Sequence, residues 1–309
     1  MKKLFFIIIF IIQFFTINSF SQYSNKTGAD LCSEKRLNGN NAIQLTGNDS
    51  PNTPKHSFDV QNYKLDLDIY NCFISPYTKS FSASNEVTLK IDTALNLISL
   101  NAKNTSLVID SVRLGSLSLT FTHTGDILNI NLDRLYTPGE TIIFKIYYRH
   151  NNVTDNGFYA GSGMVFTDCE PEGARNWFPC WDKPSDKATL DLTARVPTNV
   201  LLGSNGRLAD SVVSGGAIYY HWISRDPVST YLMTMIGKVN YNLDVIYWRK
   251  LSNPNDSIPI RFYWNTGESG VANIKSKMPS MMTRFSQIFC EHPFEKNGFA
   301  TANNLFSWG

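Results

Sequence analysis

Apolar and polar residues alternate along several short segments between residues 56 and 245. In Tyr63–Ile69 every second residue is apolar, and this period of two is typical of a β-strand with one buried face. The same period recurs at residues 87–91, 117–121, 130–132, 142–148, 190–196, 219–223 and 231–235. Turn-forming runs such as Thr124–Asp126 and Thr137–Gly139 separate these segments. We therefore expect residues 56–245 to form one all-β unit of antiparallel sheets, curved or packed as a sandwich.

The pattern changes after residue 245. The turn-forming run Ser252–Ser257 separates apolar segments at 245–248 and 258–263. Apolar residues then recur at spacings of three and four, which places them on one face of a helix: Val271, Ile274, Met278, Met281, Phe285 and Ile288. Pro279 should kink or restart this helix, and Pro293 should lie beyond its end. Residues 246–309 are thus expected to be the start of an α/β unit, cut off with the helix's apolar face exposed.

The amino terminus predicts export from the cytoplasm. Two lysines precede the apolar run Leu4–Ile12, and Ser19 and Ser21 supply the small residues of a cleavage site, so residues 1–21 are expected to be a signal peptide. A membrane anchor is the alternative, but the run is shorter than the ~20 residues that a spanning helix needs. Residues 22–55 are rich in Asn, Ser, Thr and Gly, which favours a disordered leader. We expect a secreted or periplasmic protein without a stable membrane span.

Net charge and the motifs that the sequence lacks argue against several classes of protein function. The chain has 309 residues and a net charge of +2, with no basic stripe that would favour nucleic acid as a partner. It contains no His-Glu-x-x-His, Gly-x-Ser-x-Gly, Walker or dinucleotide-binding motif, and no Cys-x-x-Cys. Among five cysteines, Cys169 and Cys180 flank a turn-rich loop. They form either a disulfide, if their Cβ atoms face each other, or two separate buried thiols.

The loop from Phe166 to Ala188 is too irregular for a strand or a helix, and it is dense in proline, tryptophan and charge. Thr167–Arg175 reads Thr-Asp-Cys-Glu-Pro-Glu-Gly-Ala-Arg, and Trp177–Pro184 reads Trp-Phe-Pro-Cys-Trp-Asp-Lys-Pro. These motifs resemble the amino-terminal domain of the aminopeptidase N family of zinc metallopeptidases. Supporting matches are Gly-Phe-Tyr at 157–159, Ser-Asn-Gly at 204–206, Ser-Thr-Tyr-Leu at 229–232 and Phe-Ser-Trp-Gly at 306–309.

The resemblance covers about residues 56–309 and implies a fold. It implies a saddle-like, mainly β domain of antiparallel sheet, followed by the truncated start of a thermolysin-like α/β catalytic domain. Phe306–Gly309 resembles the approach to the family's Gly-x-Met-Glu-Asn exopeptidase motif, so Gly309 matches the first glycine of that motif. The rest of the motif and the zinc helix are expected to lie beyond Gly309.

The resemblance also implies a role for Glu170. The family's matching glutamate pairs with the free α-ammonium of a peptide substrate, and a carboxylate suits that role because it gives a directional, charged anchor. The alternative is a solvated loop carboxylate without function. Asp168 stands where the family has a glutamine that shapes the subsite for the first side chain. Its extra negative charge is expected to raise the pKa of Glu170 or to favour a cationic substrate residue.

Two functions follow from the resemblance. In the first, the parent protein is a secreted zinc aminopeptidase that removes single residues from peptide amino termini. The zinc ligands would lie outside this chain, so the chain alone is expected to be inactive and to hold no catalytic zinc. In the second, the chain belongs to a non-catalytic relative that keeps the β domain as a peptide- or protein-binding module.

Overall fold

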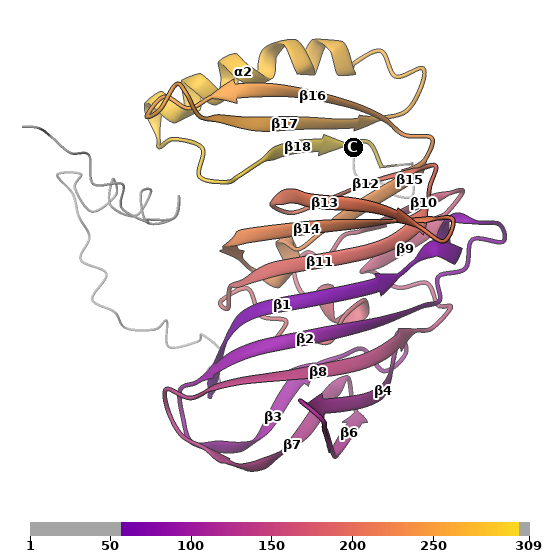
Figure 1. The fold of residues 1–309 in the computed structure, drawn as a ribbon, viewed down its shortest axis with the longest axis vertical. Helices are drawn as coiled ribbons and strands as arrows, with labels where there is room; N and C mark the ends of the chain where they lie inside the picture. The colour runs from indigo at the N-terminus through magenta and orange to yellow at the C-terminus, as the bar shows by residue number, and fades with distance from the viewer. Residues whose placement is uncertain (1–56, 303–309) are drawn as a thin grey trace, which may run out of the picture.

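Residues 57–302 are described by a computed structural model, shown as a ribbon in Figure 1. The expected signal peptide at 1–21, the leader at 22–55 and Gly309 lie outside the described residues. The strands of the largest sheet are β1 Phe58–Asp68, β2 Phe81–Ile91, β4 Leu107–Leu114, β5 Leu117–Leu119, β8 Thr141–His150, β11 Ala188–Pro197, β13 Arg207–Ser214 and β14 Ala217–Val228. They follow the order β13-β14-β11-β1-β2-β8-β4-β5.

The predicted alternation determines which face of this sheet is buried. In β1, Tyr63, Leu65 and Leu67 are buried, whereas Lys64 and Asp66 between them are exposed. Neighbouring strands run antiparallel, as expected, except that β1 and β11 are parallel. Parallel neighbours cannot be joined by a hairpin, and the strands from β2 to β10 supply the long connection between β1 and β11.

Two smaller sheets pack with the large sheet around one core. One contains β3 Leu95–Asn101, β6 Phe121–Thr124 and β7 Ile127–Tyr136, and the other β9 Phe158–Gly161, β10 Met164–Thr167, β12 Val200–Ser204 and β15 Met235–Val239. Ile98, Leu128 and Leu202 reach the same cluster as Leu65. Mainly β architecture of packed antiparallel sheets is therefore confirmed.

One predicted strand is wrong. Residues 231–235 alternate in polarity, yet Thr230–Leu232 form a 3₁₀ turn, and the strand begins only at Met235. The backbone N–H of Leu232 donates to Ser229, and that of Met233 donates to Thr230. These bonds close the turn. A single 3₁₀ turn can carry the same alternation of apolar and polar residues as a short strand.

The second unit has its own three-stranded sheet. Its elements are β16 Asn242–Arg249, β17 Ser257–Trp264, β18 Asn297–Ala300 and the helix α2 Val271–Ile288. The two apolar segments and the helix predicted from the sequence are confirmed, and β16 begins a few residues before the expected boundary at 246. Pro279 lies within one continuous helix, so no restart occurs. No helix in residues 57–302 is long and apolar enough to span a bilayer.

Helix α2 contacts the second sheet through only part of its apolar face. Met282 is buried, Met278 packs beside it, and Trp248 donates its indole N–H to Thr283 over 2.9 Å. The other apolar side chains of the predicted face are about half exposed: Ile274, Met281, Phe285 and Ile288. The contact face is thus rotated toward Met278 and Met282, and an apolar surface remains exposed.

Candidate functional site

Two buried aromatic side chains fix the loop between β10 and β11. Trp177 and Phe178 are fully buried, with ring centroids 4.5 Å apart, and Phe178 packs edge-on against Tyr63 of β1 at 5.3 Å. The Tyr63 hydroxyl oxygen accepts the backbone N–H of Trp181. Large aromatic side chains bury much area with few rotatable bonds, so they hold an irregular backbone in place. Part of the loop therefore belongs to the core.

A buried ion pair braces the same loop. Arg175 donates through Nε to Asp182 over 2.9 Å, and the Asp182 side chain is fully buried. The Asp182 carboxylate also accepts the hydroxyl of Thr230 over 2.8 Å. These bonds satisfy a carboxylate that would otherwise be costly to bury. Arg175 therefore has a structural role.

Glu172 belongs to this brace as well. Arg175 donates to it over 2.6 Å, and Lys183 donates to it over 2.8 Å. The bond from Lys183 is the largest influence on the Glu172 carboxyl and, with the charge of Arg175, holds its pKa below the usual value against the opposing effect of partial burial. Arg175 and Lys183 are therefore both engaged by Glu172 and Asp182.

Glu170, two residues earlier, is left free by this arrangement. It is exposed, and it makes no hydrogen bond or ion pair with any residue of 57–302. It lines a polar cavity of about 520 Å³ together with Lys103, Thr154, Asn156, Glu172 and Arg175, which we call the loop cavity. A rigid loop thus presents a carboxylate that has no structural partner in the described chain.

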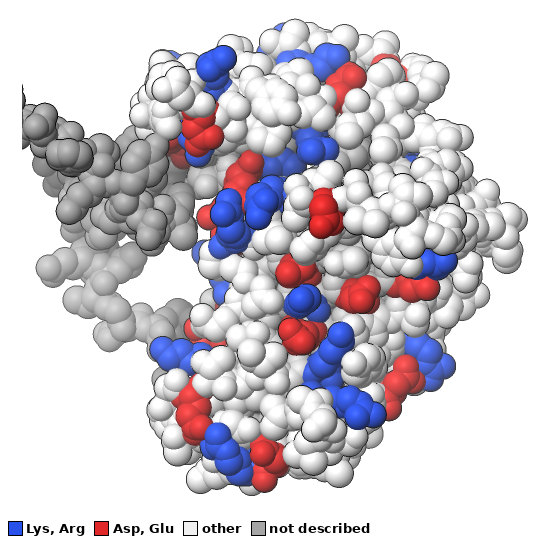
Figure 2. Space-filling view, viewed as in Figure 1, with Lys and Arg blue, Asp and Glu red and all other residues white. Residues whose placement is uncertain are grey.

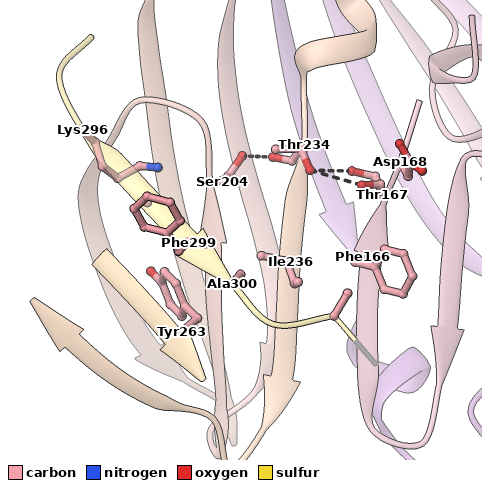
Figure 3. Close-up of a pocket in the computed structure, with 13 residues that line it drawn as sticks. Phe166, Thr167, Asp168, Ser204, Thr234, Ile236, Tyr263, Lys296, Phe299 and Ala300 are labelled. Atoms are coloured by element: carbon pink, nitrogen blue, oxygen red, sulfur yellow. Dashed lines mark hydrogen bonds between the residues drawn. The ribbon is translucent and has the colours of Figure 1, made fainter. Parts of the chain in front are cut away.

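Asp168 faces a different cavity from Glu170. A cleft of about 340 Å³ lies between β10, β12 and β15 on one side and β17 and β18 on the other, and we call it the inter-sheet cleft (Figure 3). Its walls include Phe166, Asp168, Ser204, Tyr263, Lys296 and Phe299. Burial and then the charge of Asp168 raise the pKa of nearby Tyr159. The structure does not bring the two predicted site carboxylates into one cavity.

Of the two alternatives for Cys169 and Cys180, the disulfide is not formed. Both thiols are free and buried, which was the alternative. The indole N–H of Trp177 points at the Cys169 sulfur over 3.2 Å, while Cys180 is held by two backbone hydrogen bonds to Asn101. Burial is the main cause that raises the pKa of Cys169 to about 12, so its thiol stays protonated at neutral pH.

The inter-sheet cleft also contains residues that sequence reasoning missed. Lys296 directly precedes β18 and Phe299 lies within it, more than 100 residues after Asp168. No local motif surrounds them, because the cleft is assembled from five strands that are distant in sequence. Within residues 57–302, no group of three or more His, Cys, Asp or Glu side chains could hold a metal ion.

The fold is a mainly β domain of packed antiparallel sheets, joined to a second, three-stranded sheet with one helix. Residues 60–232 match the family model of the Peptidase M1 N-terminal domain, which is more than half of the chain. The chain therefore belongs to the M1 peptidase family, and the resemblance to aminopeptidase N is confirmed.

Sequence relatives agree with this assignment. The chain is 31% identical over 127 residues to Aminopeptidase M1 of Arabidopsis thaliana, which is 41% of this chain and 13% of that protein. It is 27% identical over 219 residues to Membrane alanyl aminopeptidase of Manduca sexta, which is 62% of this chain and 21% of that protein. The chain thus spans only about a fifth or less of the length of these relatives.

Solved structures share the fold. The M1 zinc metallopeptidase of Deinococcus radiodurans, in a mutant form bound to a Tyr-Ser-Ala substrate, superposes with a TM-score of 0.70 at 22% identity, covering 81% of this chain and 58% of that chain. Aminopeptidase A of Legionella pneumophila, in complex with aspartic acid, gives a TM-score of 0.64 at 20% identity, with 81% and 29% covered.

Proposed function

We propose that this chain is the amino-terminal part of an exported, zinc-dependent aminopeptidase in which Glu170 binds the free α-ammonium of the peptide. The observation that carries the proposal is the contrast within one loop. Glu172 is held by Arg175 and Lys183, whereas Glu170 is exposed and without a partner among the described residues. A preorganised, unpaired carboxylate can accept a charge-assisted hydrogen bond without first breaking one.

Family membership supports the reaction class. Relatives carry the name aminopeptidase, and a structural neighbour is named a zinc metallopeptidase. In the proposed function, the zinc ligands come from a His-Glu-x-x-His motif elsewhere in the longer protein, because the described residues offer no metal-binding group. The metal would activate water for attack on the first peptide bond. The contribution of this chain is to bind and orient the amino terminus.

Localisation outside the cytoplasm is part of the proposal. It depends on the signal-peptide pattern of residues 1–21 and on the small residues Ser19 and Ser21. Amino-terminal sequencing of the mature protein, purified from its natural host, tests this point. A mature protein that begins after Ser21 supports export, and one that retains Leu4–Ile12 contradicts it.

The role of Glu170 is tested by two matched variants of the full-length protein. Glu170→Gln removes the charge and keeps the shape, so we expect kcat/KM for an alanyl-arylamide substrate to fall by roughly 10- to 100-fold, the usual cost of losing a charged hydrogen bond. Glu172→Gln is the control, because that carboxylate braces the loop. It should lower thermal stability while changing kcat/KM by less than about threefold.

Two results would count against the anchor. One is a folded Glu170→Gln variant with the kcat/KM of the wild type, and the other is an equal loss in both variants. The complete sequence of the protein separates the enzyme from the binding module. A His-Glu-x-x-His motif supports the aminopeptidase, and a complete sequence without it supports a non-catalytic relative.

A further inference from the structure

Cys290 differs from the other cysteines of the described chain. Cys72, Cys169 and Cys180 are free thiols in the core. Cys290 is only partly buried, and its sulfur is part of a disulfide. Burial raises the pKa of the Cys72 and Cys169 thiols to about 12, so neither ionises readily at neutral pH. Because the thiolate is the form that attacks a disulfide, these core thiols are poor partners for exchange with Cys290.

The cysteine content of the chain leaves one partner for Cys290. The sequence contains five cysteines, and three of them are free. The fifth is Cys32, which belongs to the expected leader outside the described residues and would remain in the chain after cleavage at Ser21. We propose that Cys32 forms a disulfide with Cys290 and so attaches the leader to the C-terminal end of α2.

Hydrogen bonds on its C-terminal side fix the backbone at Cys290, which lies just after the end of α2. The carboxylate of Glu291 accepts the backbone N–H of Ser252 over 2.9 Å. The backbone N–H of His292 donates to the hydroxyl oxygen of Ser286 over 3.2 Å. The Cys290 sulfur therefore has a defined position at the end of the helix, and disulfide formation requires such a position because its geometry is narrow.

The position of Cys290 also brings the leader to an apolar surface. Cys290 lines a groove of about 320 Å³ at the end of α2, which we call the helix-end groove. Phe285 and Phe289 line the same groove and are 53% and 67% exposed. A disulfide brings the two Cα atoms to within about 7 Å, so Leu31, next to Cys32, would reach these rings. Docking of Leu31 would remove part of this apolar surface from water.

The length of the leader and the chemistry of the bond both permit this pairing. Residues 33–56 could span roughly 80 Å when extended, so the chain between Cys32 and β1 is long enough. Formation breaks two S–H bonds and makes one S–S bond. The two protons and two electrons pass to the disulfide of a thiol–disulfide oxidoreductase, which is reduced to a dithiol. Compartments outside the cytoplasm maintain disulfides, so the pairing agrees with the proposed export and does not depend on Glu170 or zinc.

The pairing is tested on the full-length protein, purified from its natural host with free thiols blocked before lysis. Digestion with trypsin without reductant should yield residues 27–35 joined to residues 285–296, and reduction should separate the two peptides. The same joined peptide should form when reduced protein is treated with oxidised glutathione. A joined peptide that appears only after this treatment would support the pairing and contradict export.

Variants separate the bridge from general effects on the fold. Cys32→Ser and Cys290→Ser should each abolish the joined peptide, whereas Cys72→Ala should keep it, because Cys72 is buried and free. The two single serine variants and the double variant should lose the same number of degrees in Tm, since each lacks the same bond. Circular dichroism establishes that each variant is folded.

Hydrogen exchange tests whether the leader covers the helix-end groove. Amides of residues 285–290 should exchange faster in Cys32→Ser than in the wild type, because the groove loses its cover. The proposal is overturned if Cys32 is recovered as a free thiol from the oxidised protein, or if Cys290 is joined to Cys290 of a second copy. Equal exchange at residues 285–290 in the two proteins would also overturn it.

Discussion

At the scale of single residues, the loop between β10 and β11 divides into bracing and presenting side chains. Asp182 and Glu172 are bracing residues, because each accepts hydrogen bonds from cations of the same loop. Glu170 is a presenting residue, because nothing in the described chain holds its carboxylate. Charge alone did not distinguish these roles, since all three are acidic residues within one short segment. The difference lies in which carboxylates Arg175 and Lys183 reach.

The bracing role of Asp182 gives a stability prediction. Asp182→Asn leaves Arg175 without its buried anion, so we expect the free energy of unfolding to fall by about 3 kcal/mol. Asp110→Asn is the control, because Asp110 pairs with Arg149 at the surface, where such pairs contribute at most about 1 kcal/mol. Urea denaturation measures both losses. Equal losses of unfolding free energy would show that the buried ion pair stabilises the fold no more than the surface pair does.

Asp155 gives a prediction about pH. Its partners are the buried ring of His150 at 3.0 Å, the hydroxyl of Ser106 and the backbone N–H groups of Gly157 and Phe158. Burial raises the pKa of Asp155, but these hydrogen bonds outweigh it, and the net pKa lies below the usual value. Because the folded-state pKa is lowered, the stabilisation is complete above the unfolded value of about 4 and is lost as pH falls through the folded value.

Asp155→Asn tests this linkage. At pH 7 the variant should be less stable than the wild type by about 2 kcal/mol, since a buried carboxylate with several donors is replaced by a neutral amide. The difference in free energy of unfolding should persist down to pH ~4 and shrink below it. Denaturant titrations from pH 7 to pH 2.5 follow the difference. A difference that is constant over this range would be inconsistent with the lowered pKa.

At the scale of elements, the long, half-buried strands could be predicted and the short ones could not. β8 alternates along its whole length, and β1 does so from Tyr63 to Asp68, because one face meets the core and the other meets solvent. β10 reads Met-Val-Phe-Thr and is buried at every position, so it has no alternation to detect. The turn Thr230–Leu232 shows the opposite error, where alternation occurs without a strand. A period of two indicates that one face of a segment is buried and the other exposed. It therefore detects only strands that are buried on one face.

Contact between β9 and the loop depends on a glycine at position 157, the first residue of the Gly-Phe-Tyr match. A Cβ atom there would lie 2.4 Å from the carbonyl oxygen of Gly173. Gly157→Ala should therefore push the loop away and lower the free energy of unfolding by about 1–3 kcal/mol. Gly161→Ala, in the same hairpin, meets no atom within 4 Å and should cost much less. Thermal melts measure the loss of stability in each variant. Similar losses in the two variants would refute the close-contact explanation.

At the scale of the whole molecule, the second unit is packed onto the β domain. Met164 and Phe166 of β10 share a buried cluster with Tyr263 of β17 and with Tyr241, which directly precedes β16, and Arg225 pairs with Glu295 across the same junction. The space-filling view of Figure 2 shows basic and acidic side chains interspersed over this face, without a large area of one sign. The inter-sheet cleft lies at the junction, so its two walls belong to different units.

The candidate sites were predictable only in part, for a reason that concerns the whole molecule. Glu170 and Asp168 lie in a continuous motif, so the family resemblance could single them out from the sequence. Lys296 could not be found in this way, because its relation to Asp168 exists only after β18 joins β17 and the second sheet packs on β10. The separation of Asp168 and Glu170 into two cavities is likewise a property of packing, since adjacent motif positions usually suggest a shared site.

We propose that this chain belongs to a working zinc aminopeptidase. The most direct measurement is the release of single amino-terminal residues from a peptide by the full-length protein, before and after removal of zinc with a chelator. We expect hydrolysis that stops when zinc is removed, returns when zinc is restored, and does not occur with an amino-acetylated peptide. A folded, zinc-loaded full-length protein that releases no residue, or activity that is unaffected by the chelator, would contradict the account.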